Sequence, residues 1–125
     1  MFLPELEECL SDQSLPESLT VEFVVVVDDS TDGSLEYCRE WERRESRLRV
    51  YQGPGRGLYA GWNACLTHAR GNYILFLPCD DLLAHDALAK LSFALDQHPD
   101  CGIAHCSLGA FGEDAYLLNK WWREE

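Results

Sequence analysis

An apolar, β-branched run that ends on two carboxylates is the feature that most constrains how this chain can fold. Four consecutive valines, residues 24–27, are followed at once by Asp28 and Asp29 and then by turn residues up to Gly33. A run of this kind is typical of a buried strand in a parallel sheet. Ligands of open α/β sheets bind at the carboxyl ends of the strands, so the two acids are candidate binding residues.

The same pattern occurs a second time. Residues 73–77 are apolar, and Asp80 and Asp81 follow them after two intervening residues. Adjacent like charges repel each other unless a cation or hydrogen-bond donors hold them. Hard oxygen ligands placed close together suit Mg²⁺ or Mn²⁺, which can bridge a diphosphate. We therefore expect both Asp pairs at the carboxyl edge of one sheet, facing a shared crevice, with Asp80 and Asp81 as metal ligands; a polar turn that follows the strand is the alternative for this second pair.

Predicted strands and helices alternate along the chain. The expected strands are residues 21–27, 48–52, 73–77 and 103–107, and the expected helices are residues 3–10, 34–45, 58–69 and 84–97. This order predicts the α/β class, with a mostly parallel, Rossmann-like sheet flanked by helices. Thr31 or Asp32 is expected to cap the second helix, and Gly71 to end the third. No linker or repeat divides residues 1–125, so we expect a single domain.

Composition excludes several classes of protein. The 125 residues carry a formal net charge of −12, which argues against nucleic-acid binding and means that an anionic ligand needs a metal ion or local donors. No apolar run is long enough to span a membrane, and no secretory signal opens the sequence. The six cysteines contain no Cys-x-x-Cys pair and are expected to be reduced thiols. We expect a cytoplasmic protein, with the inner face of the membrane as the alternative location.

A glycine-rich segment separates the second strand from the third helix. Its glycines allow the backbone to approach a ligand closely, Arg56 can meet phosphate or base oxygens, and Asn63 lies on the following helix. Residues 55–60 also satisfy the Gly-x-Gly-x-x-Ala fingerprint of an NAD-type dinucleotide-binding unit, and Asp80 follows the next predicted strand. That alternative stays open here, although it leaves Asp28 and Asp29 unexplained.

Taken together, the motifs resemble the family-two glycosyltransferases, which have the GT-A fold. The stretches that carry the resemblance are VVVVDDSTDG and GRGLYAGWNACLTHARGNYILFLPCDD. The resemblance implies transfer of a sugar, with inversion and with Mn²⁺ or Mg²⁺, from a nucleotide-diphosphate sugar such as a UDP-sugar to a glycan or lipid-linked acceptor. It also implies roles for individual residues. Asp28 and Asp29 would bind the nucleoside, and Arg56 and Asn63 would lie beside the donor. Asp80 and Asp81 would bind the ribose and the metal-diphosphate group.

The sequence departs from the family pattern in three places. Pro78 stands where many members carry the first acid of the metal motif, and the family's usual opening strand is absent before Leu3. The acceptor half, which usually supplies the general base, should follow Ser107. We therefore expect a partial domain, the nucleotide-sugar-binding half, with no catalytic base assigned. A non-catalytic fragment that binds a nucleotide sugar is the alternative. Self-association is expected through strand edge or apolar surface around residues 24–27.

Overall fold

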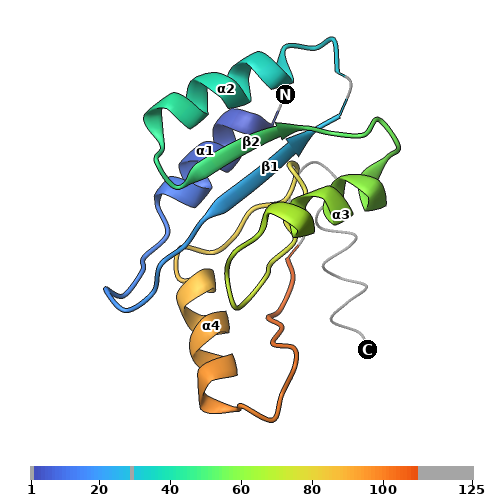
Figure 1. The fold of residues 1–125 in the computed structure, drawn as a ribbon. Coiled ribbons are helices and arrows are strands. Elements are labelled where there is room, and N and C mark those ends of the chain that lie inside the picture. The colour runs from blue at the N-terminus through green and yellow to red at the C-terminus, as the bar shows by residue number, and fades with distance from the viewer. Residues whose placement is uncertain (1, 29, 110–125) are drawn as a thin grey trace.

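The computed structural model describes residues 2–28 and 30–109 and confirms the α/β class. In this part of the chain the elements follow the order α1 (Leu3–Ser11), β1 (Phe23–Val27), α2 (Ser34–Arg44), β2 (Leu48–Gln52), α3 (Leu58–His68) and α4 (Ala87–Gln97) (Figure 1). Each of these six elements was predicted from sequence to within three residues at either end. Among the described residues, no helix is both long enough and apolar enough to cross a bilayer.

The two strands pair in parallel and form the centre of the fold. The register runs from Phe23 opposite Leu48 to Val27 opposite Gln52. Parallel strands require a crossover connection, and α2 provides it. Figure 1 shows α1 and α2 on one side of the strand pair and α3 on the other, so both faces of the strand pair are covered. This arrangement explains why β1 is apolar at every position.

Two predicted strands are wrong. Residues 73–77 and 103–107 have no ladder partner, and the sheet of the described residues contains two strands. A strand needs a neighbouring strand to bond its backbone, and an apolar pattern within one segment cannot supply that neighbour. The first of these segments is exposed over residues 73–76 and contacts two helices: Phe76 stacks on Trp62 of α3 at 4.8 Å, and the Tyr73 hydroxyl donates to Asp96 of α4 at 2.6 Å.

The core lies between α1, α2 and the strand pair. Trp41 and Cys38 of α2 are the most deeply buried side chains, with exposed fractions of 1% and 0%. They pack with Leu6 and Leu10 of α1 and with Val50 of β2. The outer face of α2 is charged and faces solvent. The buried face with Cys38 and Trp41 is therefore the part of the helix that packs against the sheet.

Replacing Trp41 by alanine should lower the free energy of unfolding by about 3–5 kcal/mol, because it removes the largest fully buried side chain and leaves a cavity. Chemical denaturation followed by circular dichroism measures the change. Phe93→Ala is the control, since this aromatic side chain on α4 is 64% exposed and its loss should change stability by no more than about 0.5 kcal/mol. Equal losses in the two variants would contradict the position of the core.

Candidate functional site

The acid-rich turn after β1 divides into a structural part and a candidate binding part. Gly33 occupies the N-cap of α2 with φ +86°, a left-handed conformation that favours glycine. The Asp32 carboxylate accepts a hydrogen bond from the Ser34 N–H at 3.0 Å and so satisfies an amide of the first turn. The Ser30 and Ser34 hydroxyls, with that amide, lower the pKa of Asp32 to about 2. The N-cap is therefore Gly33 and not Thr31 or Asp32 as predicted, although Asp32, one residue earlier, bonds the first amide of the helix; Asp29 lies outside the described residues.

Asp28 lies over the glycine-rich loop that follows β2. Its Oδ1 accepts a hydrogen bond from the Gly55 N–H at 3.1 Å. The same oxygen leaves no room for a side chain at Gly53. A Cβ atom at this position would lie 2.0 Å from Asp28 Oδ1 and 2.9 Å from Val26 Cγ1. Parallel pairing brings these two loops together, because the carboxyl ends of neighbouring parallel strands lie at one edge. Asp28 and the glycine-rich loop are thus one unit of the structure.

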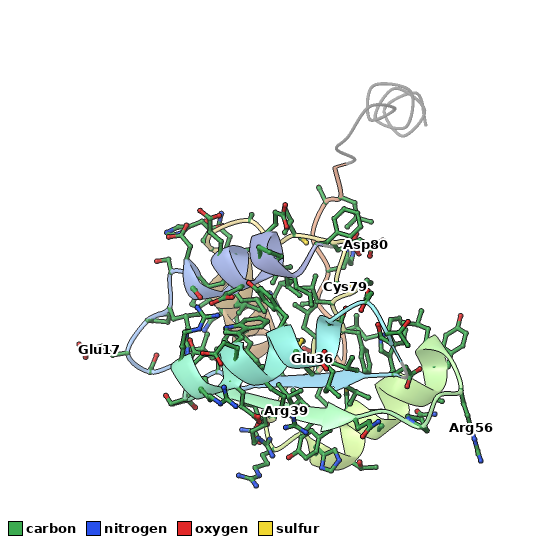
Figure 2. The ribbon with its side chains drawn as sticks, turned by 90° about the horizontal axis from the view of Figure 1, so that it is seen from above. Glu17, Glu36, Arg39, Arg56, Cys79 and Asp80 are labelled. Atoms are coloured by element: carbon green, nitrogen blue, oxygen red, sulfur yellow. The ribbon has the colours of Figure 1, made fainter. Side chains whose placement is uncertain are left out.

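Arg56 and Asn63 are both exposed. Arg56 belongs to the glycine-rich loop and extends away from the body of the molecule, and away from Cys79 and Asp80 (Figure 2). Asn63 lies on α3, the helix that packs against β1. Arg56 directly follows Gly55, whose N–H bonds the Asp28 carboxylate. The structure does not bring Arg56 to the second Asp pair.

Asp80 and Asp81 lie in a turn and not at the end of a strand, which corrects the sequence-based expectation. The Asp81 N–H donates to the Pro78 carbonyl at 3.2 Å and closes the turn, and both carboxylates are exposed. The chain before the turn is extended and ends at Leu77, which packs against the core. In Figure 1 this yellow segment leads toward the carboxyl end of β1 without joining the sheet.

A small hollow lies beside this turn. Phe2, Glu5, Cys79, Asp80 and Leu82 line it, and its volume is about 180 Å³. Pockets for drug-sized ligands typically measure about 300–1,000 Å³. The hollow is therefore too small to hold a whole nucleotide sugar, and it borders the candidate site without constituting it.

The carboxylates of this turn fit a divalent metal as a partial ligand set. Across residues 2–28 and 30–109, no three His, Cys, Asp or Glu side chains converge on one point. Asp80 and Asp81 can supply two hard oxygen ligands. Mg²⁺ is commonly bound through one or two carboxylates together with substrate phosphates and water. The donor set therefore suits a metal that binds with a diphosphate, and does not suit a site closed by protein ligands alone.

Glu22 holds the start of the segment that leads to the turn, and sequence reasoning missed it. Its carboxylate accepts hydrogen bonds from the backbone N–H groups of Arg70 and Gly71, the second at 3.0 Å, and pairs with Arg49. Burial opposes the charge, but these donors outweigh burial and lower the pKa of Glu22. Gly71 is thus bonded to Glu22, while Ala69 occupies the C-cap of α3 that Gly71 was predicted to provide. A lone Glu before a strand gave no sequence signal for this role.

The thiols of Cys38 and Cys65 do not provide an activated nucleophile. Burial, with a smaller effect from nearby Cys79, raises the pKa of the Cys38 thiol to about 11. Burial also raises the pKa of Cys65 on α3. A reactive cysteine needs a lowered pKa, so both behave as packing residues.

Comparisons with known proteins agree with the pattern of acids and glycines. The family model for Glycosyl transferase family 2 matches residues 2–123. Glycosyltransferase GlyA of Streptococcus pneumoniae is 34% identical over 69% of the chain, and the poly(ribitol-phosphate) beta-N-acetylglucosaminyltransferase TarS of Staphylococcus aureus is 31% identical over 78% of it. An uncharacterized glycosyltransferase of Haemophilus influenzae is 34% identical over 73% of the chain. These matches span 12%, 17% and 39% of the respective relatives' lengths. No solved structure gives a significant match.

Replacing Gly53 by alanine should lower the free energy of unfolding by about 1–3 kcal/mol, because the new Cβ displaces the Asp28 carboxylate from its bond to Gly55. Urea denaturation measures the loss. Gly61→Ala is the matched control: its Cβ meets open space on α3, so it should stabilise the chain by about 0.5–1 kcal/mol. A neutral Gly53→Ala variant would show that the carboxylate does not occupy this position.

Proposed function

Because the chain belongs to glycosyl transferase family 2, we propose that it forms the donor-binding part of an enzyme that takes a sugar from a nucleotide-diphosphate sugar. The match over residues 2–123 is the observation that carries this proposal. The donor is a UDP-sugar, and the acceptor is a glycan or a lipid-linked glycan. The relative TarS is named for a poly(ribitol-phosphate) polymer, which supports a polymeric acceptor. Transfer proceeds with inversion of configuration at the anomeric carbon.

The geometry supports a donor site built on the loops after β1 and β2. Asp28 is fixed by the Gly55 N–H, and the glycines leave the backbone of that loop open to a ligand. In this proposal Asp28 and Asp29 bind the nucleoside, since carboxylates accept hydrogen bonds from base imides and ribose hydroxyls. Arg56 and Asn63 lie beside the donor. Arg56 reaches the phosphates only if the loop moves inward from the position in Figure 2.

Asp80 and Asp81 hold the metal-diphosphate end of the donor, with Asp80 also near the ribose. The bound Mn²⁺ or Mg²⁺ would neutralise charge on the departing diphosphate. The protein's own task in this proposal is to orient the two carboxylates, and the backbone bond from the Asp81 N–H to the Pro78 carbonyl, which closes the turn, supports this role. A chain of net charge −12 repels a bare diphosphate, so binding of the nucleotide and of the metal are coupled.

A non-catalytic donor-binding role is the second candidate, because the relatives named above are matched over at most 39% of their lengths. The NAD-type alternative has a strand before residues 55–60 and a helix that begins within them, as its fingerprint requires. However, the family match covers residues 2–123, which include this segment and both Asp pairs. We therefore do not propose a dinucleotide-binding function.

UDP should bind in the presence of Mn²⁺ and lose its affinity when EDTA removes the metal, as measured by isothermal titration calorimetry. Asp81→Asn should weaken binding by at least about tenfold, because outer-shell changes alone typically lower metal affinity by 10–100-fold. Asp100→Asn is the control, since this acid is exposed and lies beyond α4. Equal affinity for UDP with and without the metal would reject the assigned role of the turn.

The 125-residue chain should hydrolyse UDP-sugars, with water taking the sugar and UDP leaving, at a rate that does not depend on an acceptor. Acceptor transfer needs positioning, worth about 7–11 kcal/mol of barrier, and a general base, which contributes about 10²–10⁴-fold. No residue of this chain is assigned to either task. UDP release is measured with and without mixed glycan acceptors in the presence of Mn²⁺. Acceptor-dependent release that Asp81→Ala abolishes would show that the chain holds a complete transfer site.

A further inference from the structure

Gln13 has an environment unlike that of any other polar residue in the described part of the chain. Within residues 2–28 and 30–109 it is the one polar side chain that is buried, with 8% of its surface exposed. Its amide makes three hydrogen bonds. Nε2 donates to the Cys9 carbonyl at 3.3 Å and to the Ala84 carbonyl at 2.9 Å, and Oε1 accepts from the Leu88 N–H at 3.3 Å. A buried amide is retained at such a site only when its donors and acceptor are satisfied.

Residues 9–14, which we call the α1 anchor, make further bonds to the same distant stretch of chain. The Leu83 N–H donates to Cys9 Sγ at 3.1 Å, and the Ser14 N–H donates to the His85 carbonyl at 2.8 Å. Its Asp12 carboxylate also lies 3.1 Å from His85 Nδ1. The anchor therefore binds residues 83–88 through both backbone and side chains, across more than seventy positions of sequence.

The stretch held by the anchor begins two residues after Asp81. Leu77 before the turn and Leu83 after it both pack against the core, and the turn itself is closed by the Asp81 N–H. The exposed carboxylates of Asp80 and Asp81 thus project from a short segment whose downstream end is fixed to α1. Gln13 also satisfies the Leu88 amide in the first turn of α4, where the N-cap Asp86 makes no side-chain cap.

We propose that Gln13 is a positioning residue of the donor site, holding the segment after the Asp80–Asp81 turn so that the two carboxylates stay placed for the diphosphate. This inference rests on the donor-binding function proposed above. The task requires an amide, because a glutamate at position 13 keeps the acceptor for Leu88 but cannot donate to Ala84. An apolar side chain of the same length leaves the Leu88 N–H without its partner, whereas the Ala84 carbonyl keeps only its bond from the Ala87 N–H.

The test uses Gln13→Met, Gln13→Glu and the matched control Gln97→Met, which alters an exposed glutamine at the end of α4. Hydrogen exchange monitored by NMR shows whether the α1 anchor still holds residues 83–88. In Gln13→Met the amides of Asp81 and Leu88 should exchange at least about tenfold faster, while the Val25 amide of β1 stays unchanged. Calorimetry with UDP and Mn²⁺ reports the function. Both Gln13 variants should bind about 10–100-fold more weakly than wild type, as a small misplacement of a site predicts.

The two readouts separate the outcomes. Gln13→Glu should keep slow exchange at Leu88 yet still bind UDP weakly, which a general loss of stability would not produce. If exchange at Asp81 is unchanged, or if a folded Gln13→Met variant binds UDP as wild type does, the positioning role is overturned. If wild type binds no UDP with Mn²⁺, the donor-binding function fails. Exchange at Asp81 and Leu88 then decides separately whether Gln13 holds the turn.

Discussion

The parallel pairing of β1 with β2 is the constraint on which the candidate site depends. Five residue pairs, from Phe23 opposite Leu48 to Val27 opposite Gln52, fix the register. That register brings the end of β1 next to the glycine-rich loop, and the Gly55 N–H reaches the Asp28 carboxylate there. A slip of one residue would exchange the two faces of the strand and move Asp28 off this loop. Buried Trp41 of α2 helps hold the strand pair against this slip.

The parts of the fold that follow from local pattern were predictable from the sequence. The four-valine run indicated β1, the stripe of Cys38 and Trp41 indicated the buried face of α2, and the glycines marked the loop before α3. Residues 73–77 show where this reasoning stops. Their apolar, extended character was predicted correctly, but a strand is a property of two segments, and no pattern within one segment can supply the neighbour.

The candidate site likewise contains some residues that the sequence predicts and others that it does not. The acids and Arg56 were recognisable because their chemistry is visible in the residue type and the spacing. Thr31 or Asp32 was predicted as the helix cap, but the structure has Gly33 at the N-cap, and Asp32 bonds the Ser34 N–H from the position before it. Gln13 and Glu22 could not be predicted, because each acts on backbone groups far away in the sequence: Ala84 and Leu88 for one, Arg70 and Gly71 for the other. Every residue except proline has the same backbone donor and acceptor, so the residue types do not reveal which backbone groups a side chain will bond.

The parallel register also sets the order in which this region can fold. Phe23 and Leu48 are 25 positions apart, the difference between their residue numbers, and every other pair in the ladder has the same separation. Closing a loop of this length costs conformational entropy before any ladder bond compensates for it. Helix α2 lies wholly within this loop. Its packing against both strands reduces the entropy cost of bringing them together. We therefore expect strand pairing and helix docking to form one cooperative folding unit, with the loops at its end ordered after that unit has assembled.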